Sequence, residues 1–134
     1  MIMLDTNICV YILKDHPEYI RKKFNQLESV HVSAVVVSEL WYGVENSPAQ
    51  VQAARRKQVK GFLALLTVHD WDERAAEQYG RIRAQLKKKG QMIGNVDLLI
   101  AAHALSLEAV LVTNNTREFE RIPDLKLENW YLVG

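Results

Sequence analysis

Short apolar runs alternate with longer stretches of mixed polarity along this chain. The runs have the length of buried strands, and the longer stretches repeat apolar residues at the spacing of an α-helix. The chain opens with such a run, Met1-Ile2-Met3-Leu4, and an acidic residue, Asp5, follows it directly. The pattern predicts strands at residues 1–4, 30–32, 67–69 and 109–113 with a possible edge strand at 125–130, and helices at 8–13, 17–27, 34–45, 49–66, 73–89, 97–107 and 117–121.

This alternation predicts an α/β fold in which a small parallel sheet is covered by helices on both faces. Residues that cap or stop helices support the boundaries, because Ser33 and Asp72 precede predicted helices and Gly90 follows one. The chain has 134 residues and shows no repeat, low-complexity segment or linker. We therefore expect residues 1–134 to form a single domain.

Composition says more about the cellular compartment of the protein than about its function. Charged residues make up 25% of the chain and the net charge is +1, so any basic surface for nucleic acid must be local. The one cysteine, Cys9, excludes an internal disulfide and suits a reducing compartment. No apolar stretch approaches the ~20 residues of a membrane span, and no signal peptide precedes the first strand. These features predict a soluble, cytoplasmic protein.

Four acidic residues are candidates for the edge of a parallel sheet where catalytic and ligand-binding groups usually lie. Asp5 follows the first strand, Asp97 opens a nearly all-apolar helix, and Glu118 lies beyond the last core strand, so these three could share one sheet edge. Glu39 lies inside a predicted helix. The chain has no Cys/His zinc pattern, phosphate-binding glycine loop or nucleophilic serine turn. Carboxylates without nitrogen or sulfur ligands favour a hard cation such as Mg²⁺ or Mn²⁺.

Each acid also has an ordinary structural explanation. Asp5 and Asp97 could simply cap helices, which is the commonest task of Asp before an apolar helix. Glu39 could face water, although a buried Glu among Val, Leu and Trp would need a partner. Glu118 could be a solvated charge. The joint arrangement of the four is therefore more informative than any one of them.

Four segments around these acids carry recognisable signatures. They are Met3-Leu4-Asp5-Thr6-Asn7, then Ser38-Glu39-Leu40-Trp41-Tyr42-Gly43, then residues 93–104 (Ile-Gly-Asn-Val-Asp-Leu-Leu-Ile-Ala-Ala-His-Ala), and Val112-Thr113-Asn114-Asn115 with Glu118-Phe119. In this order and spacing they resemble PIN-domain nucleases, and most closely the VapC-type toxin ribonucleases of bacterial toxin–antitoxin pairs. The resemblance covers essentially the whole chain, and the first and third segments are the most specific.

The resemblance implies a PIN-like fold and an endoribonuclease that depends on Mg²⁺ or Mn²⁺. The three core acidic positions of the family match Asp5, Glu39 and Asp97. Asp5 and Asp97 would bind the metal ion, and Glu39 would hold a water or share the ion. One or two ions fit this pattern equally well. Structured RNA such as tRNA is the substrate that relatives suggest.

The fourth acidic position departs from the family pattern. Many relatives carry Asp in the loop after the last core strand, where this chain has Asn114 and Asn115. Glu118 is the acid left to serve there. Contacts that orient the acids or bind substrate phosphate are expected from Thr6, Asn7, Thr113, Asn114 and Asn115.

The resemblance also implies protein partners. Such enzymes usually form homodimers and are inhibited by a small VapB-type antitoxin that lies across the active site. Trp41 and Tyr42, on the helix that carries Glu39, offer aromatic anchors for the antitoxin, although core packing could also account for them.

Basic residues and histidines add weaker hypotheses. A basic run shortly before Asp97 could contact RNA phosphates, although such a run is usually a solvated helix face. The four histidines share no spacing, and His103 in its apolar helix is expected to be structural. The basic run consists of Lys87, Lys88 and Lys89.

Other functions fit the sequence less well. A haloacid-dehalogenase-like phosphatase also has an acid after its first strand, but it needs a second acid two positions later, where this chain has Asn7. A degenerate, non-catalytic binding module would have no need for three acids. A nuclease of the same superfamily with another role, in DNA or RNA processing, is the nearer alternative, although DNA-cutting relatives generally carry more acids and larger insertions.

Overall fold

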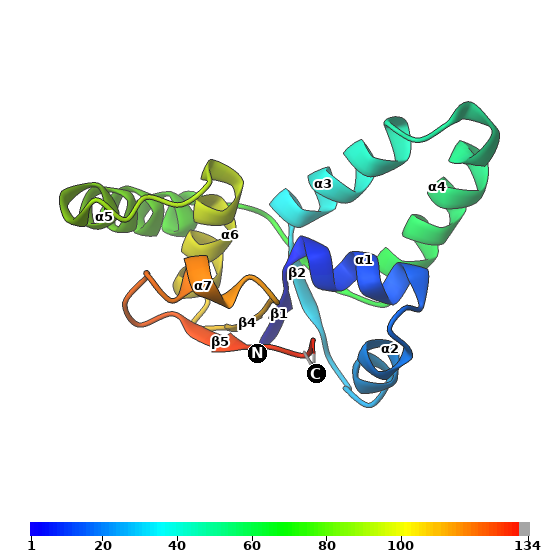
Figure 1. The fold of residues 1–134 in the computed structure, drawn as a ribbon, viewed down its shortest axis with the longest axis horizontal. Helices are drawn as coiled ribbons and strands as arrows, with labels where there is room; N and C mark the ends of the chain where they lie inside the picture. Colours follow the sequence, from blue (N-terminus) through cyan, green and yellow to red (C-terminus); the bar gives the residue numbers. More distant parts are fainter. Residues whose placement is uncertain (132–134) are drawn as a thin grey trace.

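The computed structural model describes residues 1–131, which contain a five-stranded sheet (Figure 1). Every neighbouring pair of strands is parallel, in the order β3-β2-β1-β4-β5. The predicted α/β fold, a parallel sheet flanked by helices, is confirmed. The strands are β1 (Ile2–Leu4), β2 (His31–Ser33), β3 (Thr67–His69), β4 (Val110–Val112) and β5 (Lys126–Glu128).

The helices follow the predicted order with shifted ends. Two carry predicted site residues at their starts, α1 (Thr6–Lys14) and α6 (Asn95–Ser106). No helix among the described residues is long and apolar enough to cross a bilayer. The other helices are α2 (Glu18–Asn25), α3 (Ala34–Glu45), α4 (Ala49–Leu63), α5 (Glu73–Lys89) and the short α7 (Thr116–Phe119).

The helix starts correct two expectations. Helix α1 begins at Thr6 and not at residue 8, because the Asp5 carboxylate accepts a hydrogen bond from the Thr6 backbone N–H at 2.8 Å. Helix α6 begins at Asn95, after Gly94 in extended backbone, so Asp97 lies within its first turn and is not its cap. Helix α4 ends at Leu63 and not at residue 66, because 3₁₀-type bonds of 3.0 and 3.1 Å replace the expected last turn.

The order of the strands reverses direction at β1. The chain leaves β1 to form β2 and β3 on one side, and then crosses back to form β4 and β5 on the other. Since crossovers between parallel strands are right-handed, helices α1 to α4 cover one face of the sheet and α5 to α7 the other. Figure 1 shows α5 and α6 to one side of the strands and α1, α3 and α4 to the other. Such a reversal opens a crevice at the carboxyl ends of the strands, here β1 and β4.

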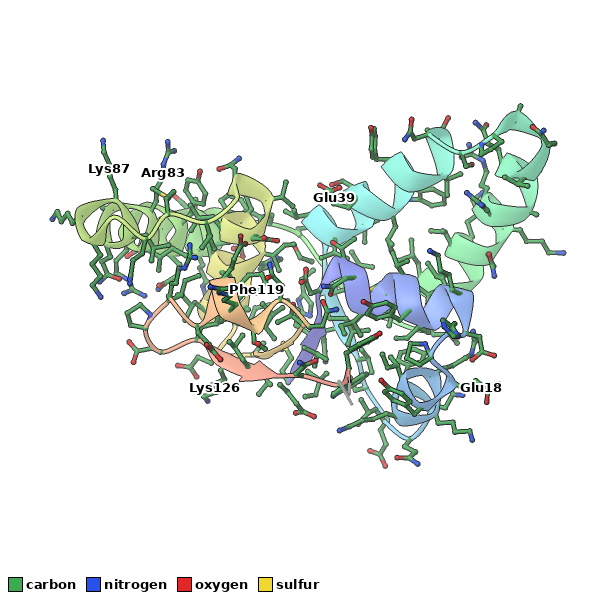
Figure 2. All side chains as sticks on the ribbon, viewed as in Figure 1. Glu18, Glu39, Arg83, Lys87, Phe119 and Lys126 are labelled. Carbon is green, nitrogen blue, oxygen red and sulfur yellow. The ribbon has the colours of Figure 1, made fainter. Side chains whose placement is uncertain are left out.

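Apolar residues from both layers hold the central strands rigidly in place. Met3 and Leu4 on β1 are fully buried, and so is Leu111 on the adjacent strand β4. Phe119 of α7 is also fully buried (Figure 2). Cys9 lies in the same core, where burial raises the pKa of its thiol, so it is the inert thiol that its apolar neighbours suggest.

Candidate active site

A pocket of about 650 Å³ opens where β1 and β4 end. It brings together three acids that lie far apart in the sequence: Asp5 after β1, Glu39 on α3 and Asp97 on α6. Among residues 1–131, no Lys or Arg lines this pocket. The lining residues are Asp5, Thr6, Asn7, Val10, Tyr11, Glu39, Val96, Asp97 and Asn115.

Asp5 is buried at the base of this pocket, with 4% of its surface exposed. One carboxylate oxygen caps α1, and the other accepts a hydrogen bond from the Thr113 hydroxyl at 2.7 Å. Burial raises the pKa of Asp5, while the hydrogen bonds from Thr113 and Thr6 act in the opposite direction. Asp5 is therefore both a helix cap and a fixed, partly desolvated carboxylate.

Asn115 connects the other acids. Its side-chain amide donates to Asp97 Oδ2 at 3.4 Å and to Glu118 Oε2 at 3.1 Å. Its backbone N–H donates to the Thr113 hydroxyl at 3.0 Å, which joins this group to Asp5. The loop after β4 thus fastens all of these residues into one network.

The acids affect one another electrostatically. The pKa of Asp97 is raised to about 7, mainly by burial and further by a hydrogen bond with Glu118 and by the charges of Asp5, Glu118 and Glu39. Glu118 therefore lies close to Asp97, although it does not line the pocket. An arrangement in which carboxylates repel one another this strongly is one that a bound cation would relieve.

The two asparagines after β4, Asn114 and Asn115, contact different parts of the site. The Asn7 side chain donates to the Asn114 side-chain oxygen, and the Asn114 amide donates to the Tyr11 hydroxyl at 2.8 Å. Asn114 therefore binds α1, whereas Asn115 binds the acids. The sequence grouped the two asparagines together, and it gave no indication of Tyr11.

The donor set fits a hard cation. Within residues 1–131 no group of three or more His, Cys, Asp and Glu side chains is arranged to hold a metal ion by itself. Mg²⁺ needs no such cage, because it binds through one or two carboxylates and keeps several waters. Asp5, Asp97 and Glu39 supply carboxylate oxygens, and the buried Asn7 Oδ1 has no hydrogen-bond partner among the described residues.

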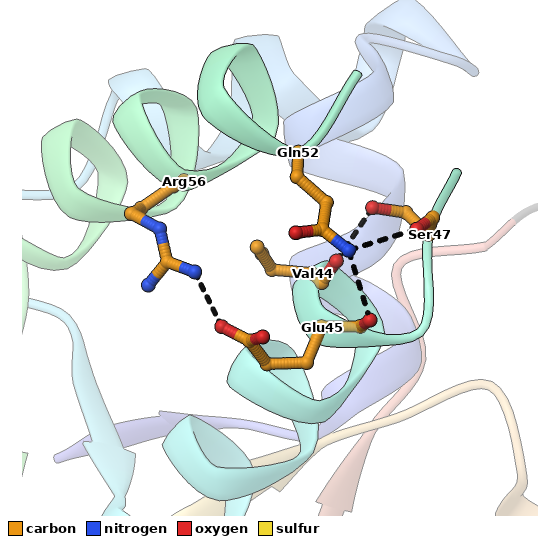
Figure 3. Close-up of polar contacts among 5 residues, drawn as sticks. All are labelled: Val44, Glu45, Ser47, Gln52 and Arg56. Carbon is orange, nitrogen blue, oxygen red and sulfur yellow. Dashed lines mark hydrogen bonds and ion pairs between the residues drawn. The ribbon is translucent and has the colours of Figure 1, made fainter. Parts of the chain in front are cut away.

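The predicted aromatic anchors on α3 differ in exposure. Trp41 is half-buried, and the guanidinium carbon of Arg56 on α4 lies 5.8 Å from its ring centroid. Arg56 also pairs with Glu45, and the Gln52 amide donates to the carbonyls of Glu45 and Ser47 at 3.1 and 3.0 Å (Figure 3). These bonds fix α4 against α3. Tyr42, by contrast, is 64% exposed.

The basic run lies away from the pocket. Lys87, Lys88 and Lys89 are exposed in the last turn of α5, and none of them lines the acidic pocket. Any contact with RNA from this run would be made outside the pocket.

Three of the four histidines gather on one face of the sheet, which the sequence did not predict. His31 Nδ1 and His69 Nε2 lie 2.8 Å apart, and His103 Nδ1 lies 2.7 Å from the Ser33 hydroxyl. Burial lowers the pKa of His31 and of His103. None of the three lines the acidic pocket, and the structural role expected for His103 agrees with its burial.

The raised pKa of Asp97 predicts how the stability of the fold changes with pH. The folded chain holds a proton on Asp97 up to a pH of about 7, whereas the ordinary pKa is 3.8, so stability falls as pH rises through that window. Asp97→Asn removes this loss. Because the side chain is only half-buried, we expect a gain of about 1 kcal/mol at pH 8 and a smaller one at pH 5.

Urea unfolding of the ion-free protein in EDTA measures this effect. Asp124→Asn is the matched control, because Asp124 is exposed and its positive φ of 68° suits Asn. The control should follow the parent chain at both pH values. A gain from Asp97→Asn that is the same at pH 5 and pH 8 would contradict the electrostatic explanation.

Known proteins match this chain over the residues that form the pocket. The sequence matches the family model of the PIN domain over residues 2–125, which include all four acids. Ribonuclease VapC2 of Rickettsia felis is 44% identical over 134 residues, and tRNA(fMet)-specific endonuclease VapC of Salmonella typhimurium is 46% identical over 129 residues, each alignment covering 96% of both proteins. The crystal structure of VapBC2 from Rickettsia felis, bound to a DNA fragment from its promoter, matches with a TM-score of 0.91 at 42% identity and covers 98% of this chain and 100% of that one.

Proposed function

This chain belongs to the PIN domain family, among the VapC ribonucleases, and we propose that it is a metal-dependent endoribonuclease toxin restrained by a small antitoxin. We further propose tRNA(fMet) as the substrate, because the Salmonella relative is named for that specificity and aligns with 96% of this chain. Mg²⁺ or Mn²⁺ is the proposed ion.

One observation carries the proposal. Asp5, Glu39 and Asp97 line a single pocket at the reversal point of a parallel sheet, without a thiolate or imidazole among its lining residues. An all-oxygen site selects hard cations, and phosphodiester hydrolysis is a reaction that such cations assist. A non-catalytic binding module would not need three mutually repelling carboxylates in one pocket.

The residues divide the chemistry among them. Asp5 and Asp97 would hold the ion, which supplies a Lewis acid that polarises the phosphate and activates a water for attack. Glu39 makes no hydrogen bond or ion pair with another described residue, so its carboxylate is free to orient that water and accept its proton. Thr113 keeps Asp5 in place, and Asn115 keeps Asp97 and Glu118 in place.

The proposed inhibitor is a VapB-type antitoxin. The relative from Rickettsia felis was solved as a VapBC2 complex on promoter DNA, which supports an equivalent partner here. The exposed ring of Tyr42 offers a contact, and the half-buried Trp41 beside it is the second proposed anchor. A homodimer of the toxin is proposed on the family resemblance alone.

The direct test compares two tRNAs. The purified chain, freed of any antitoxin and supplied with Mg²⁺, should cut tRNA(fMet) at one site and leave elongator methionine tRNA largely intact, with RNA-end sequencing to locate the cut. Adding the cognate antitoxin should stop the reaction. Equal cutting of both tRNAs would contradict the substrate, and cutting of DNA in place of RNA would favour a different branch of the superfamily.

A further inference from the structure

A basic edge of α5, formed by Arg83 and Lys87, faces the same side of the molecule as Glu39 (Figure 2). Figure 2 shows Arg83 and Lys87 projecting from α5 toward the side on which Glu39 lies. Tyr79 is one turn before Arg83 on the same helix face. Arg83 Nη1 donates to the Tyr79 hydroxyl at 3.3 Å, and its guanidinium carbon lies 5.8 Å from the Tyr79 ring centroid. The exposed Arg83 side chain is therefore held against a neighbour.

Tyr79 connects this edge to the helix that carries Asp97. Its hydroxyl donates to the Asn95 side-chain oxygen at 2.6 Å, and Asn95 is the first residue of α6. Trp71 packs edge-on against the Tyr79 ring, with centroids 6.1 Å apart, and donates to the Leu99 carbonyl at 2.9 Å. The position of Arg83 is thus fixed relative to the first turn of α6, where Asp97 lies.

Arg83 has a charge without an acidic partner. Within residues 1–131 the ion pairs are Lys23–Glu128 and Arg56–Glu45, and neither involves α5. Arg81 on the same helix points elsewhere, and two of its N–H groups bind the Gln78 side chain. Arg83 is exposed, and its guanidinium has further N–H donors besides the one that binds Tyr79. The planar guanidinium can donate two parallel hydrogen bonds to the oxygens of a phosphate.

An RNA chain needs such a group outside the pocket. The pocket that would receive the phosphate to be cut is lined by carboxylates and has no basic residue. Neighbouring phosphates must therefore find positive charge outside this pocket, and Arg83 and Lys87 of α5 present it on the same side as Glu39 (Figure 2).

We propose that Arg83, held in place by Tyr79, binds an RNA phosphate that flanks the one being cut, with Lys87 as a looser contact one turn further along. The inference rests on the proposed function, because it assumes an RNA chain across the acidic pocket. It makes Arg83 a residue for substrate binding and not for bond cleavage.

The test measures binding without cleavage. Fluorescein-labelled tRNA(fMet) is titrated onto chains that carry Asp97→Asn, alone or with Arg83→Gln, Arg83→Lys or Arg81→Gln. Arg83→Gln should weaken binding about 10-fold and reduce the slope of log affinity against log salt by about 0.7 to 0.9. Arg83→Lys should lose about 3-fold, because charge remains without the fork. Arg81→Gln is the matched control and should stay within about 2-fold.

Cleavage kinetics distinguish an effect of Arg83 on RNA binding from an effect on the cleavage step. With an intact Asp97, Arg83→Gln should raise KM about 10-fold and change kcat by less than about 3-fold, which a merely structural role would not do selectively. Circular dichroism and size-exclusion chromatography check that each variant is folded and keeps its oligomeric state.

Two results would overturn the inference. One is RNA binding by Arg83→Gln that matches Arg81→Gln in affinity and salt slope. The other is unchanged RNA binding with loss of the antitoxin complex or the dimer, which would make Arg83 a protein contact. Failure of the proposed function can be distinguished from failure of this inference, because the parent chain would then cut no RNA at any concentration.

Discussion

Asp5→Asn is expected to reduce RNA cleavage by about a thousandfold while the chain stays folded. A metal ion supplies several kcal/mol of transition-state stabilisation, and each 1.36 kcal/mol is a factor of about ten in rate. Asn is as good an N-cap as Asp, so the substitution preserves the start of α1 while it removes the charge and replaces the oxygen that faces the Thr113 hydroxyl by an amide NH2 group. The measurement is kcat/KM on tRNA(fMet) with saturating Mg²⁺.

This substitution separates the two explanations of Asp5. If the residue were only a helix cap, Asp5→Asn would cleave like the parent chain. The exposed residue Asp124 provides the charge-matched control, since Asp124→Asn removes one carboxylate outside the pocket. In the same series Glu118→Gln should lose less activity than Asp5→Asn, because Glu118 borders Asp97 but does not line the pocket.

Removing divalent cations with EDTA should stop cleavage completely, and Mg²⁺ or Mn²⁺ should restore it. The reason is the all-oxygen pocket, in which the carboxylates have no cationic side chain to bind phosphate in place of an ion. Titration calorimetry with Mn²⁺ provides a readout independent of activity. The parent chain should bind the ion, and Asp5→Asn should bind it at least about 10-fold more weakly.

Two outcomes would refute metal dependence. Cleavage that continues in EDTA, after the protein has been dialysed against chelator, would require the carboxylates to act as acid and base alone. Equal Mn²⁺ affinity of the parent chain and Asp5→Asn would place the ion elsewhere on the protein.

The sequence predicted the fold where the hydrophobic pattern was strong and missed details where packing decided. The run before Asp5 has to be buried, so a strand there followed from composition alone. Helix α6 began two residues earlier than predicted, because Asp97 matched a cap and Asn95 and Val96 carry no core-facing pattern. The helix starts after Gly94 without a side-chain cap, so no capping residue marks its beginning in the sequence.

The site was predictable in its acids and not in the bonds between them. The strand end before Asp5 and the helix start at Asp97 were enough to group these two acids, and the family resemblance added Glu39. The contacts of Asn115 depend on the conformation of the loop after β4, which no local pattern encodes. His31 and His69 are 38 positions apart and meet because β2 and β3 pair with Ser33 beside His69, which puts His31 two positions away on the same face.

The connection between Asp5 and Thr113 spans 108 positions of the chain, from its first strand to the loop after its fourth. Proteins are made from the N-terminus, so Asp5 leaves the ribosome long before Thr113 and Asn115 have been synthesised. Until then β1 lacks its neighbour β4, and the acids lack the loop that fastens them. A chain still being translated therefore has no assembled pocket, and its acids come together only after the loop that follows β4 has left the ribosome.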